Sequence, residues 1–138
     1  MITLAVDAMG GDIGLDVTLP GAKSFLEKVP DAHLILVGDR PSIEQKLANE
    51  YPVASDRVTI CHSKEHVAMD DNPFSALRNK RHSSMRLAID LVESREAKAA
   101  VSAGNTGALI AISKHVLKTL PGIERPAIAK FLPGYKDK

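Results

Sequence analysis

The stretch AAVSAGNTGALIAISKHVLKTLPGIERPAI, residues 99–128, decides the fold class of this chain. Its first residues, Ala99–Ser102, are apolar and partly β-branched, which predicts a buried strand. A turn of small residues, Ala103–Gly107, follows the strand. Apolar residues then recur at the spacing of one helical face: Leu109, Ile112 and Val116. Pro121-Gly122 is expected to end that helix, so the stretch forms half of a βαβ unit.

The small-residue turn is a candidate anion-binding site. The turn of a βα unit lies at the carboxyl edge of the sheet, where the next helix directs its free N–H groups and positive dipole end into the cleft. Gly104 and Gly107 carry no side chain that would keep a phosphate from the backbone, and Asn105 and Thr106 can donate hydrogen bonds. Small residues at such a turn serve tight packing about as often as ligand binding, so both interpretations stay open.

The rest of the chain repeats the alternation of strand and helix. Strands are predicted at residues 2–6, 34–37 and 58–61, and a last apolar run spans 127–132. Helix starts are expected at four further places: Thr18 as a cap with Pro20 in the first turn, a Ser42–Gln45 capping box, Asn72-Pro73, and a Ser83-Ser84 cap. This order predicts one α/β domain over residues 1–138, with a doubly wound, mostly parallel sheet and flanking helices.

Right-handed crossovers bring the carboxyl ends of all parallel strands to one edge, where ligands of open α/β sheets bind. At that edge we expect Asp7, Ser102 and a second glycine-rich turn that contains Gly10, Gly11 and Asp12. This turn can contact an anion while Asp7 or Asp12 positions a ligand, a metal or the loop. It can equally be a tight turn in which the carboxylate caps backbone N–H groups.

A basic cluster of Arg78, Lys80 and Arg81 precedes the helix start at Ser83 and Ser84. Guanidinium groups beside the N–H donors of a helix suit phosphate or an acidic partner. A solvated charged turn is the competing interpretation.

Residues 62–66 match H-x-x-E-H, the inverted zinc-peptidase motif, through His62, Glu65 and His66. That chemistry needs both histidines on one helical face and a third ligand from elsewhere. Here the motif directly follows a strand, so we interpret the match as chance, with a zinc hydrolase as a distant alternative. Cys61 ends an apolar strand and is expected to be a small buried hydrophobe.

Composition narrows the function classes. The net charge is +1 and aromatic residues make up 4% with no Trp, which argues against nucleic-acid partners and base-stacking surfaces. A single cysteine excludes an internal disulfide and favours a reducing, cytoplasmic setting. The first residues enter a strand pattern without the features of a signal peptide, and no apolar run is long enough to span a bilayer.

Four motifs in order resemble the N-terminal part of the bacterial phosphate acyltransferase (PlsX) family: AVDAMGGD at 5–12, SSMRLAIDLV at 83–92, VSAGNTGAL at 101–109 and GIERPAI at 122–128. The similarity runs from Ile2 to about Pro133. It implies transfer of a fatty acyl group from acyl carrier protein to inorganic phosphate, giving an acyl phosphate for a membrane glycerol-3-phosphate acyltransferase. It also implies a fold similar to the isocitrate and isopropylmalate dehydrogenase group, dimers, no organic cofactor, and a cytoplasmic enzyme with peripheral membrane contact.

Under this resemblance the glycine turns and the Ser83-Ser84 helix start would hold phosphate, and the basic cluster would dock the acidic carrier protein. We assign no general base. Family members are more than twice this length, so we expect the chain to be a fragment, a truncated gene product or a frameshifted reading. A non-catalytic phosphate- or carrier-binding module is therefore the alternative function. The resemblance implies that the partners of the apolar run 127–132 lie beyond Lys138. We therefore expect an oligomeric or aggregation-prone chain with little transferase activity.

Overall fold

A computed structural model describes residues 1–53, 55–132 and 134; Pro133, near which we expect the resemblance to end, lies outside them. At its centre is a four-stranded, fully parallel sheet in the order β3-β2-β1-β4. The strands are β1 (Ile2–Asp7), β2 (Ala32–Gly38), β3 (Val58–His62) and β4 (Ala99–Ser102). The structure thus contains the strands expected at 2–6, 34–37, 58–61 and 99–102. Their observed ends differ from the predicted ones by at most two residues.

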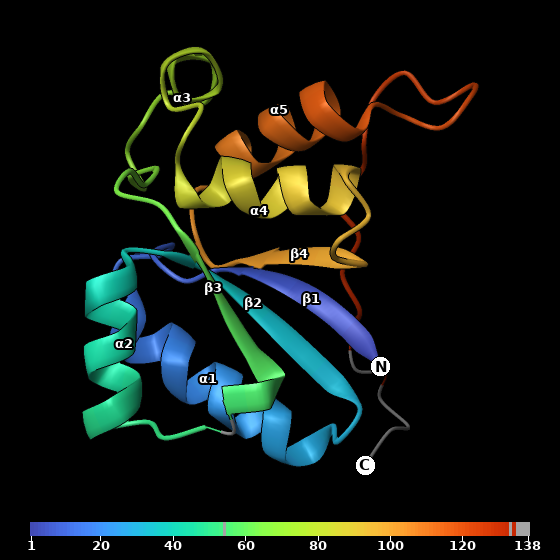
Figure 1. The fold of residues 1–138 in the computed structure, drawn as a ribbon. Coiled ribbons are helices and arrows are strands. Elements are labelled where there is room, and N and C mark those ends of the chain that lie inside the picture. The colour runs from blue at the N-terminus through green and yellow to red at the C-terminus, as the bar shows by residue number, and fades with distance from the viewer. Residues whose placement is uncertain (54, 133, 135–138) are drawn as a thin grey trace.

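Helices cover both faces of the sheet (Figure 1). One face carries α1 (Leu15–Lys28) and α2 (Arg40–Asn49), and the other carries α4 (Ser84–Glu93) and α5 (Thr106–Leu117). The short helices are η1 (Ser55–Arg57) and α3 (Pro73–Asn79), which packs against α5. The predicted doubly wound α/β architecture is confirmed, while the specific likeness to the dehydrogenase group stays a prediction.

The core is divided by the sheet, because successive strand residues point to opposite faces. On the α1 side, Leu34 and Leu36 of β2 pack with Leu19 and Leu26 of α1. On the α4 side, the intervening strand residues Ala5, Ile35 and Val37 pack with Ala88. Both faces of β2 are buried, which explains the unbroken apolar run at 34–37.

Two predicted helix starts are wrong. Helix α1 begins at Leu15 after Gly14, whose φ of 67° ends the preceding turn, so Thr18 lies inside the helix. The Thr18 hydroxyl donates to the Ala8 carbonyl at 2.7 Å and so ties the helix to the end of β1. Helix α2 is capped by Asp39, whose carboxylate accepts from the Ser42 N–H, so there is no Ser42–Gln45 capping box. Asp39 comes first along the chain and satisfies the orphan N–H itself.

The caps predicted at the other two helices are confirmed. Asn72 accepts from the N–H groups of Phe74 and Ser75 at the start of α3. Ser83 caps α4 by accepting from the N–H of Arg86. Arg86 and Asp90 pair along the same helix, with 2.8 Å between Nε and Oδ1.

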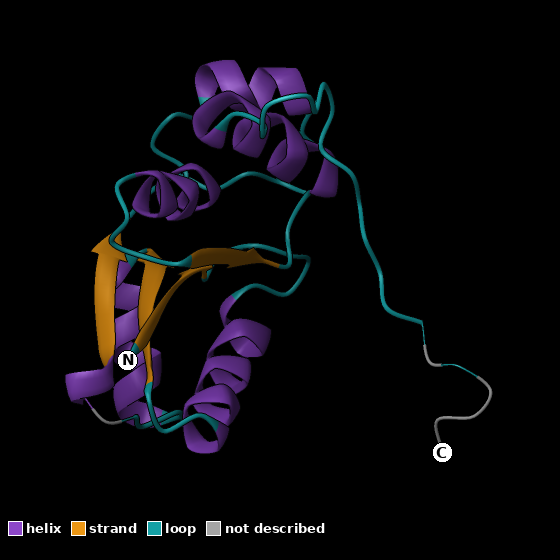
Figure 2. Cartoon of the chain, turned by 90° about the vertical axis from the view of Figure 1, so that its right-hand side faces the viewer, coloured by secondary structure: helices purple, strands orange, loops and turns teal. Residues whose placement is uncertain are grey.

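The end of the chain differs from expectation. Helix α5 ends at Leu117, before Pro121, because Lys118 adopts a left-handed φ of 64°. Residues 127–132 form no strand in the structure, and each of them is exposed. Figure 2 shows this segment leaving the body of the molecule beyond α5. Among the described helices, none combines the length and the apolar composition that crossing a bilayer requires.

Candidate functional site

The carboxyl ends of the strands meet at one edge, as the parallel register requires. Asp7 at the end of β1 lies opposite both Val37 of β2 and Ser102 of β4. Gly38 lies opposite His62 at the end of β3. The turns that follow these strands therefore share one surface, and the predicted gathering of residues there is confirmed.

A buried hydrogen-bond chain joins the turn after β1 to the turn after β4. The Ser102 hydroxyl donates to Asp7 Oδ2 at 2.7 Å and accepts from the Gly104 N–H at 3.1 Å. Asp7 is only 2% exposed, and its second oxygen, Oδ1, has no partner among the described residues. The carboxylate thus joins two predicted site elements that are distant in sequence.

The glycines of this edge are required by packing inside the protein. A β-carbon on Gly10 would lie 2.6 Å from Asp7 Oδ2 and 3.1 Å from the Gly104 nitrogen. One on Gly104 would lie 3.1 Å from the Met85 methyl group. Gly11, at φ 91°, faces the Ala103 carbonyl in the same way. The two turns therefore press against each other, which supports the packing interpretation of Gly10 and Gly104.

Asn105 is fully engaged within the chain. Its Oδ1 caps α5 by accepting from the Ala108 N–H at 3.1 Å. Its Nδ2 lies within 3.2 Å of the carbonyl oxygens of Ala68, Met69 and Asp71. The side chain thus clamps the loop 68–71 onto the start of α5, and binding a ligand through Nδ2 would require it to release these carbonyls.

Thr106 and Gly107 lie exposed at the start of α5. A β-carbon on Gly107 would lie 2.8 Å from Cγ of Pro73, so this glycine allows α3 and α5 to approach closely. The backbone of these two residues opens the helix, and their N–H groups have no acceptor among the described residues. They are the part of the predicted turn that remains available to a ligand.

The start of α4 joins the same edge through residues 63–67. The Ser84 N–H donates to the Glu65 carbonyl at 2.9 Å, and Ser63 Oγ lies 2.7 Å from the carbonyl oxygens of Glu65 and His82. Ser83 and Ser84 are fully buried, and Ser84 Oγ lacks a hydrogen-bond partner within the described part of the chain. Met85 connects this helix start to Gly104, so the three predicted phosphate-binding elements form one continuous body.

A cleft of about 310 Å³ opens beside this body, over the start of α1. Its lining includes Gly11, Asp12 and Gly14 of the first turn together with Lys46 of α2 and His66. Gly14 provides no side-chain cap for α1. The N–H groups of Leu15 and Asp16 therefore open the helix without an acceptor from the described residues. The cleft thus combines a cation, a free helix start and a glycine turn, which favour an anion, with the carboxylates of Asp12 and Asp16, which do not.

Lys46 also pairs with Asp16 at 2.5 Å, and hydrogen bonding to that carboxylate raises the pKa of the lysine. Lys46 therefore stays charged at neutral pH. No sequence pattern predicts that Lys46 lines this cleft, because it lies on a polar helix far from the glycine turns along the chain. Only the packing of α2 beside α1 brings it to the cleft.

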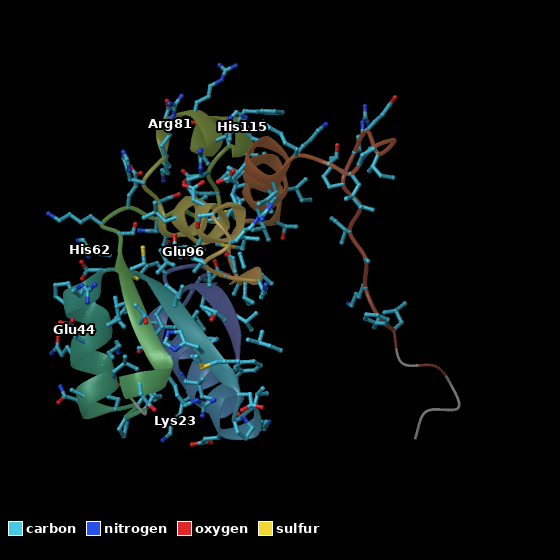
Figure 3. All side chains as sticks on the ribbon, turned by 45° about the vertical axis from the view of Figure 1, so that its right-hand side comes forward. Lys23, Glu44, His62, Arg81, Glu96 and His115 are labelled. Carbon is cyan, nitrogen blue, oxygen red and sulfur yellow. The ribbon has the colours of Figure 1, made fainter. Side chains whose placement is uncertain are left out.

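The basic cluster does not act as one unit. Lys80 pairs with Asp71 and donates to the His66 carbonyl at 3.1 Å, so it holds the 66–71 loop in place. The hydrogen bond from Lys80 also lowers the pKa of Asp71. Arg78 and Arg81 are exposed and make no hydrogen bond or ion pair with any described residue. Figure 3 shows Arg81 projecting at the outer end of the molecule, far from His62.

The three residues of the zinc-peptidase pattern do not converge. His62 Nδ1 accepts from the Arg40 N–H at the start of α2, whereas Glu65 Oε2 accepts from the His82 N–H. His66 lines the cleft described above. Over residues 1–53, 55–132 and 134, no three potential ligands lie close enough to hold a metal ion. Cys61 is partly buried against the α4 face, and burial raises the pKa of its thiol.

Comparison with known proteins gives one consistent result. The sequence model of the family described as "Fatty acid synthesis protein" matches residues 2–138. A phosphate acyltransferase of Neisseria meningitidis serogroup A is 59% identical over 138 residues, covering 99% of this chain and 39% of that protein. Phosphate acyltransferases of Chromobacterium violaceum and Shewanella woodyi are 58% and 50% identical, over 98% and 99% of this chain and 39% and 40% of their own lengths.

The chain thus spans about two fifths of the length of these curated relatives. The match extends over all four motifs from which the sequence predicted the family. The chain therefore belongs to the fatty acid synthesis protein family, the family of the bacterial phosphate acyltransferases.

Proposed function

We propose that this chain is the phosphate-holding part of a phosphate acyltransferase. The enzyme would convert an acyl-[acyl carrier protein] and inorganic phosphate to an acyl phosphate and free carrier protein, in phospholipid synthesis. The observation that carries this proposal is the carboxyl edge. There, the turns after β1 and β4 are joined through Asp7 and Ser102 beside a cleft that contains Lys46. Relatives named phosphate acyltransferase across the whole chain support the same reaction.

Phosphate would bind where N–H groups have no acceptor within the described chain. These are the starts of α1 and α5, with Lys46 and His66 on the cleft wall. In the cleft, the start of α1 would hold the dianion together with Lys46, which would exchange its partner Asp16 for phosphate. The free N–H groups at the start of α5 lie outside this lining and provide a second contact point. The buried Asp7 carboxylate acts on the turns and keeps them in register. Ser83, Ser84, Ser102 and Asn105 have the same positioning role in this proposal.

The reaction needs little besides positioning and charge stabilisation. A phosphate oxygen attacks the thioester carbonyl carbon, the C–O bond forms, and the C–S bond breaks as the tetrahedral intermediate collapses. The electron pair leaves with the carrier thiolate, which takes up a proton from water. The oxyanion of the intermediate needs N–H donors, which helix starts provide. No residue of the described chain is assigned as general base.

Docking of the acidic carrier protein would use Arg78 and Arg81, because their guanidinium groups are exposed and free of internal partners. Lys80 would contribute through the shape of the 66–71 loop, which its bonds to Asp71 and to the His66 carbonyl hold in place. We also propose a homodimer in the cytoplasm, with peripheral contact to the membrane and to the downstream glycerol-3-phosphate acyltransferase.

A second candidate is a phosphate- or carrier-binding module without turnover. It is favoured by one observation: the side chains of Ser102 and Asn105 at the site are hydrogen-bonded within the chain and hold its turns, a role in binding more than in chemistry. An acyl phosphate assay with acyl carrier protein thioester and phosphate separates the two candidates. Acyl phosphate formation above the uncatalysed rate identifies the enzyme, whereas phosphate binding without product identifies the module.

The binding half of the proposal is tested by phosphate titration of the ¹⁵N-labelled chain. We expect saturable amide shifts at residues 11–16 and 104–107. Lys46→Gln should weaken the phosphate affinity about fivefold, since one lost ion pair at a partly exposed site is worth about 1 kcal/mol. Lys23→Gln, on the same side of the sheet but outside the cleft, is the matched control. Shifts confined to residues 78–82 would contradict this placement of phosphate.

Carrier docking is tested in the same chain with the double variant Arg78→Glu/Arg81→Glu. Charge complementarity acts mainly on association, so we expect a slower association with carrier protein and a defect that shrinks with added salt. Lys28→Glu/Lys98→Glu reverses two exposed cations outside the basic cluster and controls for the same change in net charge. A defect equal at low and high salt would contradict an electrostatic docking role.

A further inference from the structure

An apolar groove remains open on the α1 face of the sheet, at its β4 edge. It has a volume of about 310 Å³ and is lined by Leu4, Val6, Val17, Gly21, Phe25 and Val101, among others. Val101 is 50% exposed although it lies in a strand of the sheet. β4 ends the strand order and pairs only with β1 among the described strands. Val101 of β4 therefore belongs both to the groove and to the strand with the unpaired edge, so the two features are adjacent.

An exposed apolar segment follows the next helix. Ile128 and Leu132 are each 74% exposed and Phe131 is fully exposed. If the segment 127–132 were extended, Ala127, Ala129 and Phe131 would face one side, and Ile128, Lys130 and Leu132 the other. Pro126 directly precedes the segment, and strands tolerate proline at their start. Among the described residues, the chain thus presents a strand-like exposed segment together with a sheet edge that no other strand pairs with.

The topology places the segment at that edge. The steps from β1 to β2 and to β3 run in one direction with α1 and α2 on one face, whereas α5 leaves β4 on the opposite face (Figure 1). A right-handed crossover with α5 on that face puts the next parallel strand on the side of β4 away from β1. Because α5 starts at the carboxyl edge, its end returns the chain to the amino edge, where a parallel strand must begin.

From these observations we infer that residues 127–132 of this same chain dock as a fifth parallel strand on the free edge of β4, with one of their apolar side-chain sets filling the groove. The resulting order β3-β2-β1-β4-β5 is that of a doubly wound sheet. Docking pairs the free N–H and C=O groups of β4 and removes the apolar surface on both partners from water. The inference concerns the sheet alone and does not depend on the proposed reaction.

Amide hydrogen exchange of the ¹⁵N-labelled chain, at a concentration where sedimentation shows a monomer, tests this directly. We expect the amides of 128–132 to exchange at least about tenfold more slowly than an unstructured chain, because docked strands open only by local unfolding. In the variant Ile128→Asp/Phe131→Asp this protection should disappear. The control Leu120→Asp/Ile123→Asp, in the exposed connection before the segment, should retain it.

A second pair of variants changes the groove and leaves the segment 127–132 unaltered. Gly21 lines the groove, and nothing lies within 4 Å of a β-carbon added there. Gly21→Leu therefore places a larger apolar side chain at the groove, and Gly21→Ala matches its effect on helix propensity. We expect Gly21→Leu to lower protection of 128–132 and Gly21→Ala to leave it unchanged. Unprotected amides in the monomer would overturn the inference. Protection found only in a dimer and lost on dilution would also overturn it, because the strand would then come from a second copy.

Discussion

The two glycine-rich turns at the carboxyl edge differ in how much of their hydrogen-bonding capacity the chain itself uses. In the turn after β4, Ser102 is bonded to Asp7 and Asn105 is bonded on both ends of its amide. In the turn after β1, Asp12 is exposed, Gly14 leaves the start of α1 without a side-chain cap, and a cleft opens beside it. The turn after β4 is therefore mainly structural, and the turn after β1 is the more open to a ligand.

This difference predicts different roles for Asn105 and Asp12 in the proposed enzyme. Asn105 was a candidate ligand contact because an amide can donate to phosphate. In the structure its Nδ2 is committed to the carbonyls of the 68–71 loop. Replacing it should therefore affect folding first and binding second, whereas Asp12 should show the reverse order.

The largest effect is expected at the contact between the turns. Gly10→Ala would put a β-carbon 2.6 Å from Asp7 Oδ2, which must move and weaken its hydrogen bond with Ser102. Overpacking and the lost hydrogen bond together should lower the free energy of unfolding by about 3 kcal/mol. Urea unfolding followed by circular dichroism measures this change.

Gly21→Ala is the control for the glycine substitution itself. It adds the same methyl group within α1, where nothing lies within 4 Å of the new β-carbon. Because alanine favours the helix, the free energy of unfolding should rise by about 0.5–1 kcal/mol. If Gly10→Ala were as stable as wild type, the two turns would not be pressed together as described.

A smaller loss is expected at the Asn105 clamp. Asn105→Ala removes the cap of α5 and leaves carbonyls of the 68–71 loop without their donor, for a loss of about 2 kcal/mol in unfolding free energy. Asn72→Ala removes only an exposed cap at α3 and should cost about 1 kcal/mol. Equal losses for the two asparagines would show that the clamp adds nothing to capping.

The fold was largely predictable because it depends on local patterns. Apolar runs such as 34–37 marked the strands, and Asn72 and Ser83 marked two helix starts correctly. Thr18 and Ser42 failed for a common reason: each is a good cap residue that lies shortly after a better place to begin a helix. A cap preference alone does not say which of two nearby residues opens the helix.

The position of the site could be predicted from the sequence, but the hydrogen bonds and ion pairs within it could not. Strand ends mark the carboxyl edge, so Asp7, Ser102 and both turns could be placed there from the sequence. The bond from Ser102 to Asp7 and the pairing of Lys80 with Asp71 depend on three-dimensional contacts that no local pattern encodes. The same holds for Lys46, which reaches the cleft only because α2 packs beside α1.

The smallest effect is expected at Asp71, which holds the loop clamped by Asn105. The hydrogen bond from Lys80 lowers its pKa below the ordinary value of 3.8. A lowered pKa means that the carboxylate stabilises the folded state above that value, and this contribution is lost as the pH falls through the folded pKa. Asp71→Asn should therefore lower the melting temperature slightly at pH 7, and its difference from wild type should shrink below about pH 4.

Asp70→Asn is the matched control, because Asp70 is exposed and has no hydrogen bond to any described residue. Its melting temperature should follow that of wild type over the whole pH range. A gap between Asp71→Asn and wild type that stayed constant down to pH 3 would mean that the side chain acts through shape and not through charge. The charge of the Lys80–Asp71 pair would then add little to the loop. The loop would be held by Asn105, by the bond from Lys80 to the His66 carbonyl and by the bond from the Ala68 N–H to Asp71.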